Sequence, residues 1–328
     1  MKIFEDKYIV ITGGAGFIGS CMIRHLNDLG FKNLIIVDEL GSNEKWKNLV
    51  GKSFIEFVPK RELFSWLVGK EKDIEAFIHL GACSSTIERN ADYLIENNTR
   101  FSIRLAEYAL TCGHRFIYAS SAATYGDGTL GFSDDHALLD RYRPLNMYGF
   151  SKQLFDLWVK ENGLLDKVVG LKYFNIFGPN ELHKGNMASA LVKMVPDAQL
   201  RGVIHLFRSN DPGNYADGEQ KRDFLYVKDA VKMTAAFLSN DQMGIFNIGR
   251  GISHSWNELA HAVFKALEKP PFIEYVEMPD ELAGKYQNYT CALMKKSKEA
   301  KGCVLAETSL EDAVFDYVRH YLIPGKRW

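Results

Sequence analysis

The segment Lys7–Ser20, KYIVITGGAGFIGS, predicts a strand, a glycine-rich turn and the first turn of a helix. The run KYIVIT is apolar and rich in β-branched residues, which is typical of a buried parallel strand. From Phe17 onward, apolar residues recur at the spacing of one helix face, and Gly30 stands where a glycine commonly ends a helix. This order of strand, turn and helix is the first unit of an alternating α/β fold.

The glycines of this turn have the spacing of a dinucleotide-binding turn. Gly13 permits the tight bend, Gly16 lets the backbone approach a pyrophosphate, and Gly19 lets the helix pack closely on the strand. The N–H groups and the dipole of the helix N-terminus would attract the phosphates. A second apolar strand, Leu34–Asp38, ends in a carboxylate that would bind the adenosine ribose. The sequence therefore predicts a nicotinamide dinucleotide site.

Strand and helix patterns continue to alternate through the first half of the chain. Further strands are expected at 54–58, 76–80, 115–120 and 168–174, and helices at 61–68, 92–111 and 147–161. Strands separated by helices predict a doubly wound parallel sheet of the Rossmann type. We assign residues 1–178 to this dinucleotide-binding domain. Residues 179–328 are expected to form mostly a smaller α/β lobe for the substrate, interleaved with late strands of the sheet at about 220–255. The elements of this second part are expected near 187–195, 203–207, 223–227, 228–238, 244–248, 255–268 and 309–322.

The composition is that of an ordinary soluble globular chain, with 46% hydrophobic and 25% charged residues. The formal net charge of -1 excludes a nucleic-acid-binding surface spread over the whole chain. No apolar run reaches the roughly 18 residues that a membrane span needs, and residues 1–14 do not resemble a signal peptide. The five cysteines stand far apart and form no CxxC pair, which favours reduced thiols and gives no zinc site. We therefore expect a cytoplasmic protein that binds no metal ion, membrane or nucleic acid.

A tyrosine and a lysine, Tyr148 and Lys152, stand one helical turn apart at the start of the helix expected at 147–161. Side chains four residues apart share a helix face. A phenol with a pKa of about 10 is a poor base at neutral pH, and a neighbouring cation lowers that pKa. Ser121 lies at the carboxyl end of the preceding strand, where side chains point toward the ligand crevice. Together these three residues predict hydride transfer at the dinucleotide.

The residues beside the ribose leave both NAD and NADP open as the cofactor. Asp38 favours NAD, and Glu39 adds negative charge where NADP carries its extra phosphate. Against this, Lys45, Lys60 and Arg61 follow soon after and could neutralise that phosphate.

The chain resembles the extended short-chain dehydrogenase/reductase superfamily in GGAGFIG at 13–19, YASSAATYG at 118–126, YGFSK at 148–152 and LKYFNIFGP at 171–179. Within that superfamily it is similar to the ADP-L-glycero-D-manno-heptose 6-epimerase family. The segments that carry this similarity are HLGACSST at 79–86, ENN at 96–98, PLNMYGFSK at 144–152, YFNIFGPNELHKGNMAS at 173–189, QKRDFLYVKD at 220–229 and PDELAGKYQ at 279–287. They span nearly the whole chain. Four residues differ from the family pattern, namely Glu39, Leu80, Asn186 and Lys193.

This resemblance implies a Rossmann domain with a small substrate lobe, bound NADP, and a homo-oligomer that is pentameric in at least one member. It also implies that C6 of ADP-D-glycero-β-D-manno-heptose is inverted by transient oxidation and re-reduction, which supplies heptose for the lipopolysaccharide core. Tyr148 would be the first acid/base and Lys184 the second, while Lys152 would orient cofactor and phenol, and Ser121 would bind the reacting oxygen.

The resemblance also implies two sets of binding residues. For the cofactor they are Gly13, Gly16, Phe17, Ile18, Gly19, Asp38, Glu39, Lys45, Lys60, Leu80, Gly81, Ala82, Cys83, Ser84, Asn97, Lys152, Ile176 and Lys184. For the substrate they are Ser121, Asn175, His183, Asn186, Lys193, Phe207, Arg208, Ser209, Asn210, Arg222 and Tyr286.

Other functions stay open at this point. Lys184 could hold the substrate diphosphate instead of moving a proton. A nucleotide-sugar 4-epimerase would use a single tyrosine and would not need Lys184. A 4,6-dehydratase would need an acidic pair beside the catalytic serine, where this chain has Ala122 and Ala123. A non-catalytic dinucleotide-binding sensor is the alternative from a different class, and it would not need the serine, tyrosine and lysine that this chain keeps.

Overall fold

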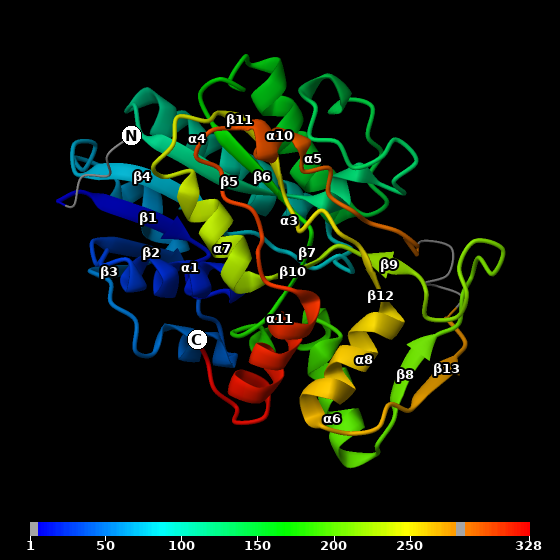
Figure 1. Cartoon of the computed structure of the whole chain (residues 1–328). Coiled ribbons are helices and arrows are strands. Elements are labelled where there is room, and N and C mark those ends of the chain that lie inside the picture. The colour runs from blue at the N-terminus through cyan, green and yellow to red at the C-terminus, as the bar shows by residue number, and fades with distance from the viewer. Residues whose placement is uncertain (1–5, 280–285) are drawn as a thin grey trace.

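A parallel sheet of seven strands forms the centre of the protein (Figure 1). The computed structural model describes residues 6–279 and 286–328. The strands are β1 (Tyr8–Thr12), β2 (Leu34–Asp38), β3 (Glu56–Pro59), β4 (Ile74–His79), β5 (Arg115–Ser121), β6 (Val169–Tyr173) and β11 (Gly244–Ile248). Their order across the sheet is β11-β6-β5-β4-β1-β2-β3. The predicted doubly wound α/β fold is therefore confirmed.

Helices cover both faces of this sheet. They are α1 (Phe17–Asp28), α2 (Leu63–Trp66), α3 (Ala91–Leu94), α4 (Phe101–Thr111), α5 (Met147–Glu161) and α7 (Val227–Ala236). Because alternate residues of a strand point to opposite faces, Ile9 and Ile11 of β1 pack in one core with α1 and α7. Val10 between them packs in a second core with α2, α4 and α5. The strand order reverses between β1 and β4, and such sheets bind ligands in the crevice outside the carboxyl ends at that point.

A smaller lobe lies below and to the right of the sheet in Figure 1. Its two-stranded sheets are β7 (Asn175–Phe177) with β10 (Phe224–Tyr226), β8 (Ile204–Phe207) with β13 (Ile273–Val276), and β9 (Lys221–Arg222) with β12 (His254–Ser255). Its helices are α6 (Leu191–Leu200), α8 (Trp256–Leu267) and α11 (Leu310–Tyr317). The chain leaves this lobe to add α7 and β11 to the main sheet, and α10 (Lys295–Glu299) lies beside β11.

Short turns of other helix types connect these elements. The 3-10 turns are η1 (Glu44–Leu49), η2 (Lys60–Glu62), η4 (Ala122–Tyr125), η5 (His136–Leu138) and η6 (Leu182–Met187), and the π turns are η3 (Ile95–Arg100) and η7 (Val318–Leu322).

Among the stretches that differ from the sequence expectation, two carry residues of the predicted site. The single helix expected at 92–111 is α3, the π turn η3 and α4, because η3 takes in extra residues that an apolar period does not reveal. The helix expected at 187–195 is η6 followed by α6, which continues past Pro196 to Leu200. The second difference is relevant to function, because η6 carries Lys184.

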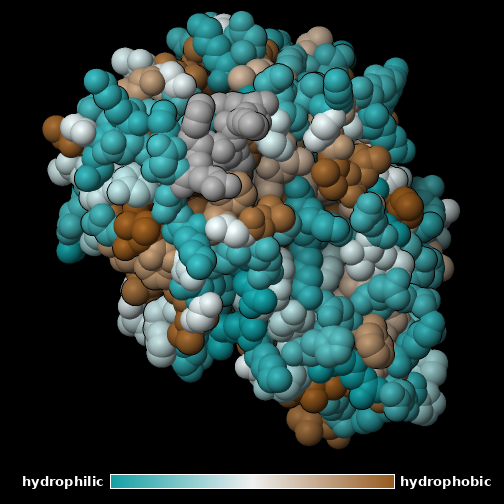
Figure 2. All heavy atoms as spheres, turned by 60° about the vertical axis from the view of Figure 1, so that its left-hand side comes forward, coloured by the Kyte–Doolittle hydropathy of each residue, from teal (hydrophilic) through white to brown (hydrophobic). Residues whose placement is uncertain are grey.

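Hydrophilic side chains predominate on the face drawn in Figure 2, where hydrophobic residues appear in small separate groups. In the part of the chain that the structure describes, no helix has the length and apolar character that crossing a membrane requires. All five cysteines are free thiols.

Candidate active site

A cavity of about 670 Å³ opens at the carboxyl ends of the central strands. Its wall combines the glycine turn after β1, the loops after β2 and β4, the end of β5, the start of α5, and η6. Every residue expected to bind the cofactor lines this cavity, and so do Ser121, Tyr148, Asn175 and His183. The fold therefore brings the predicted cofactor and catalytic residues into one space.

Two positions of the turn require glycine because the protein's own backbone lies close to them. Gly13 has a φ of +69°, and a Cβ on it would lie 2.7 Å from the Cα of Gly81. A Cβ on Gly19 would lie 2.1 Å from the carbonyl oxygen of Gly13, so only glycine allows α1 this close to the turn. Helix α1 begins after Gly16, which has no side chain to cap the helix. Its N-terminal N–H groups and positive dipole end therefore suit a pyrophosphate.

The acid at the end of β2 is already partnered within the protein. Asp38 accepts hydrogen bonds from the Ala15 N–H at 2.9 Å and from the Lys45 ammonium at 2.8 Å. Lys60 donates to the side chain of Asn97, which η3 carries, and burial lowers the pKa of this lysine. Two lysines thus stand beside the predicted ribose-binding acid, and both line the cavity.

The three predicted catalytic residues also line this cavity. Ser121 ends β5, and Tyr148 and Lys152 lie in α5, which begins with the Asn146 side chain capping the Gly149 N–H at 2.8 Å. The Lys152 ammonium donates to the Ala119 carbonyl at 2.8 Å, and burial lowers its pKa to about 8. Burial raises the pKa of Tyr148, while a hydrogen bond with Ser121 acts in the opposite direction. In the protein alone, burial is therefore the largest influence on the pKa of Tyr148, and it acts against the lowering that the sequence predicts from a neighbouring cation.

The loop that carries Lys184 is closed by a buried carboxylate. Glu181 accepts hydrogen bonds from the Ser189 N–H and hydroxyl, both at 2.6 Å, and from the Gly178 N–H at 3.3 Å. Lys184 points its ammonium to within 5.5 Å of the centre of the Phe17 ring. Burial lowers the pKa of Lys184, and the charge of Glu181 opposes this. A buried lysine with a lowered pKa can exchange a proton more readily than an exposed one.

His183, which precedes Lys184, is held by two asparagines. Its Nδ1 lies 3.0 Å from the Asn180 carbonyl and 3.1 Å from the Asn48 side-chain nitrogen. Asn48 is fully buried and also donates to the Ala15 carbonyl of the glycine turn at 3.1 Å. Burial lowers the pKa of His183 to about 4, so its ring is neutral near pH 7. These contacts fix the Lys184 loop to the dinucleotide turn.

Arg222, which is predicted to bind the substrate, has a buried guanidinium. Arg222 is 7% exposed, and burial lowers its pKa. Its charged group lies 4.8 Å from the Tyr286 ring centre and 5.9 Å from that of Trp256. No carboxylate of the described residues forms an ion pair with it. Since a buried charge normally has an opposite charge beside it, Arg222 is suited to an anionic ligand. Tyr286 also lines a second cavity of about 640 Å³, together with Leu145 and Tyr215.

The remaining predicted substrate residues are less closely grouped. Asn175 accepts a hydrogen bond from the Thr290 hydroxyl at 3.1 Å. Arg208 forms an ion pair with Glu277 at 3.3 Å, and the Ser209 N–H donates to Asp217 at 2.8 Å. Seven predicted substrate residues line neither cavity, namely Asn186, Lys193, Phe207, Arg208, Ser209, Asn210 and Arg222. Of the segment 279–287 on which part of the resemblance rested, residues 280–285 lie outside the described residues.

The sequence model of the NAD dependent epimerase/dehydratase family matches residues 9–249, which include the glycine turn, Tyr148, Lys152 and Lys184. The chain belongs to this family. An ADP-L-glycero-D-manno-heptose-6-epimerase from Nitratidesulfovibrio vulgaris is 50% identical over 316 residues, which cover 95% of this chain and 97% of the relative.

Two solved structures of epimerases share the fold over nearly the whole chain. The ADP-L-glycero-D-manno-heptose-6-epimerase of Helicobacter pylori has a TM-score of 0.79 at 27% identity, covering 96% of both chains. A UDP-N-acetylglucosamine 4-epimerase of Methanobrevibacter ruminantium has a TM-score of 0.78 at 26% identity, covering 98% of this chain and all of the other.

The cavity fits the dinucleotide on which the epimerase/dehydratase family depends. Pyrophosphate needs a glycine turn at an open helix N-terminus, and this protein has Gly13 and Gly19 beside the uncapped start of α1. The ribose needs an acid at the end of the second strand, which is Asp38 of β2. Among the described residues, no cluster of three or more His, Cys, Asp or Glu side chains could hold a metal ion. The Ser–Tyr–Lys set beside such a cradle is suited to oxidation and reduction of an alcohol.

Sequence reasoning missed several residues of this family member's site. Asn43, Tyr93, Phe101 and Met187 line the cofactor cavity, and Asn48 fixes His183. Asn48 and Asn43 stand in an irregular polar stretch with no motif, so no local signal marks them. Tyr93 lies in α3, just before η3, and its nearness in the chain to Asn97 is the one sequence signal that could have found it.

Proposed function

We propose that this protein inverts C6 of ADP-D-glycero-β-D-manno-heptose to give the L-glycero epimer, with tightly held NADP. The observation that carries this proposal is a second buried proton-transfer group, Lys184, in the same cavity as Tyr148. The full-length similarity to a relative with the name ADP-L-glycero-D-manno-heptose-6-epimerase supports the choice of substrate.

Inversion at an alcohol carbon explains the need for two such groups. The bound nicotinamide supplies a reversible hydride acceptor. The substrate hydroxyl loses its proton to a base as its carbon loses the hydride, which leaves a ketone. Returning the same hydride to the opposite face requires the ketone to turn, because the cofactor cannot move. The oxygen then points to a different wall of the cavity, and a second acid must donate a proton there.

The residues of the chain have separate roles in this scheme. Tyr148 serves as base in one orientation of the substrate. Ser121 forms a hydrogen bond with the same reacting oxygen, and Lys152 holds the phenol and cofactor in place. Lys184 serves the other orientation, and its lowered pKa favours proton exchange near neutral pH. Arg222, buried and without a carboxylate partner in the described chain, holds the diphosphate.

The decisive experiment follows hydrogen at C6. We expect the purified protein to convert the D-glycero into the L-glycero epimer without added cofactor. In D₂O the product should gain no deuterium on carbon, because the hydride returns from the cofactor. Mass spectrometry after back-exchange of hydroxyl groups makes this measurement. Deuterium at C6 would instead show removal of a proton to solvent, and the oxidation–reduction mechanism would be wrong.

The cofactor preference is tested separately. Lys45→Met and Lys60→Met should each weaken NADP binding about tenfold and leave NAD binding within twofold, because each removes one cation from the extra phosphate. Arg61→Met is the matched control, since Arg61 is exposed and does not line the cavity. Calorimetric titration of the nucleotide-free protein measures both affinities. Purification with NAD alone would reject NADP and leave the epimerase proposal intact.

The structural likeness to a UDP-N-acetylglucosamine 4-epimerase supports one rival function. A 4-epimerase would turn over UDP-hexoses and keep its activity without Lys184. A dinucleotide-binding sensor would hold the cofactor and convert neither substrate. The assay with both nucleotide sugars separates these three. A cytoplasmic location and a homo-oligomer, pentameric by family resemblance, stay predictions.

A further inference from the structure

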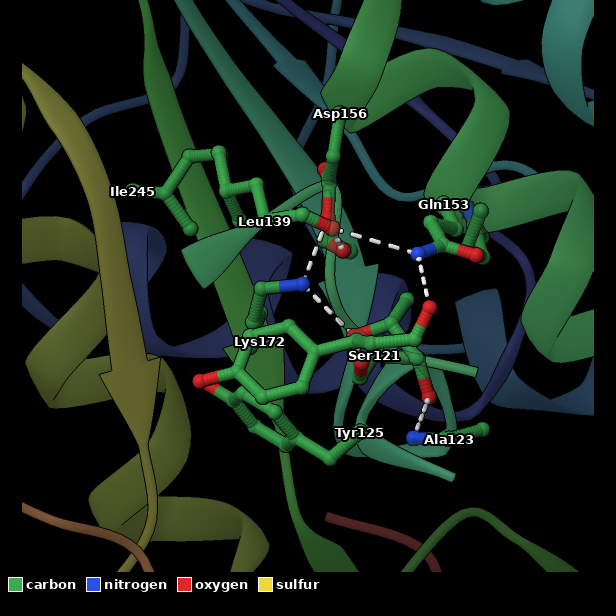
Figure 3. A network of polar contacts seen from close by, with 12 residues as sticks. Ser121, Ala123, Tyr125, Leu139, Gln153, Asp156, Lys172 and Ile245 are labelled. Atoms are coloured by element: carbon green, nitrogen blue, oxygen red, sulfur yellow. Dashed lines mark hydrogen bonds and ion pairs between the residues drawn. The ribbon is translucent and has the colours of Figure 1, made fainter. Parts of the chain in front are cut away.

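A fully buried ion pair lies beneath the catalytic residues. Asp156 of α5 and Lys172 of β6 are each about 1% exposed, and the Lys172 ammonium lies 2.6 Å from an Asp156 oxygen. Figure 3 shows the two side chains pointing toward each other beside Ser121 and Tyr125. Neither residue lines the cofactor cavity, so neither touches the reacting groups.

The Asp156 carboxylate ties α5 to β5. It accepts a hydrogen bond from the Ser120 hydroxyl at 2.7 Å and from the Tyr118 hydroxyl at 3.0 Å. Ser120 is the chain neighbour of Ser121. Asp156 lies one helical turn after Lys152, which itself lies one turn after Tyr148, so the three share one face of α5.

Lys172 extends the same connection to the turn that follows Ser121. Its ammonium donates to the Thr124 hydroxyl at 2.6 Å, and the Thr124 hydroxyl donates to the Ser121 carbonyl at 2.8 Å. Lys172 also stands opposite Ser120 in the pairing of β5 with β6. The ion pair is therefore connected to the end of β5 before Ser121, through Ser120, and after it, through Thr124. Asp156 also belongs to α5, the helix that carries Tyr148 and Lys152.

We propose that Asp156 and Lys172 are positioning residues, whose buried pair holds Ser121 and the Tyr148–Lys152 face of α5 in register for proton transfer. This rests on the proposed function for its kinetic test. Burying two charges gives little net stability, since well-packed apolar residues often stabilise a core as well. The pair contributes directional hydrogen bonds instead. Because the Asp156 carboxylate accepts from three donors, it fixes the angle of α5 against β5 in a way that apolar contacts do not. Misplacing catalytic groups by about 1 Å can cost roughly 10²-fold in rate.

The test uses variants that avoid leaving one buried charge alone. The double variant Asp156→Asn with Lys172→Met removes both charges, and Lys172→Arg keeps the pair. We expect the double variant to fold, to keep KM and dinucleotide affinity within about threefold, and to lose roughly 10²-fold in kcat. Lys172→Arg should retain kcat within about threefold, because a guanidinium can bond Asp156 and Thr124. A purely structural pair would lower the melting temperature without this split between kcat and KM.

Asp229→Asn is the matched control. Asp229 is buried in α7, which packs against α1, β7, β10 and β11, and it accepts a hydrogen bond from the Thr308 N–H at 2.9 Å. It should lower the melting temperature and leave kcat unchanged.

Crystal structures of the variants supply a readout that needs no substrate. In the double variant, the Lys152 ammonium or the Ser121 hydroxyl should move by more than about 0.5 Å, the tolerance of a preorganised site. If the wild type epimerises no ADP-heptose, the proposed function fails and this displacement alone decides the positioning role. Unmoved side chains, or a double variant with normal kcat, would overturn the inference.

Discussion

Tyr148→Phe and Lys184→Met should each lower the rate of epimerisation by roughly 10²–10⁴-fold, which is the usual value of one positioned acid or base. Each variant removes one of the two proton-transfer groups that the proposed mechanism needs, and both residues line the cavity. Substrate binding should survive Tyr148→Phe because the ring remains. It should weaken for Lys184→Met only if that ammonium also contacts the diphosphate. Initial rates in both directions, with the dissociation constant of the substrate, measure these effects.

A partial reaction separates the two orientations. With an aldehyde analogue of the sugar, the enzyme can oxidise one molecule and reduce another, and each half needs one proton-transfer group. In each variant, the partial reaction should slow more for one orientation of the substrate than for the other. Lys193→Met is the control, since Lys193 is an exposed lysine of α6 that lines neither cavity. Near-normal activity of Lys184→Met beside an inactive Tyr148→Phe would make Lys184 a binding residue and leave a single tyrosine for both faces.

Arg222→Met should raise KM for the nucleotide sugar by about 30- to 10³-fold with little change in kcat. Losing one partner of a buried charge pair costs roughly 2–5 kcal/mol, and a remote diphosphate is held equally in the ground and transition states. The melting temperature of the substrate-free protein should stay the same or rise, because Arg222 is buried without a carboxylate among the described residues. Steady-state kinetics measures the expected rise in KM, and thermal unfolding of the same preparation measures the expected change in melting temperature.

The comparison variant is Arg208→Met, whose exposed guanidinium pairs with Glu277. It should change KM by less than threefold. A fall in melting temperature for Arg222→Met together with an unchanged KM would mean that Arg222 supports the packing of Tyr286 and Trp256 and binds no anion.

The sequence predicted the central sheet well because its signals are local. Apolar runs, the glycines at 13, 16 and 19, and the acid at the end of β2 each lie within one strand–turn–helix unit. The spacing of Tyr148 and Lys152 likewise needs only one helix. The clustering of these segments then follows from parallel topology, because the carboxyl ends of neighbouring strands meet at one edge.

The parts that stayed hidden depend on pairs distant in the chain. The contact of Asn48 with His183 joins two irregular loops, and the pair of Asp156 with Lys172 depends on how α5 rests against the sheet. The sign of the pKa shift at Tyr148 was also beyond sequence reasoning, because it depends on burial rather than on the neighbour one turn away. The substrate roles that the resemblance implies for the positions of Asn186 and Lys193 stay predictions, and both side chains are exposed and line neither cavity.

The pairing of β11 with β6 in the main sheet limits how recombination between related genes can exchange the substrate lobe of such enzymes. β11 pairs with β6 through five consecutive positions, from Gly244 with Val169 to Ile248 with Tyr173, although substrate-side segments separate the two strands in the chain. A single crossover between two related genes, placed between these strands, would join a β6 from one parent to a β11 from the other. New substrate specificities in this architecture are therefore more easily acquired by changing loops in place than by exchanging a whole lobe.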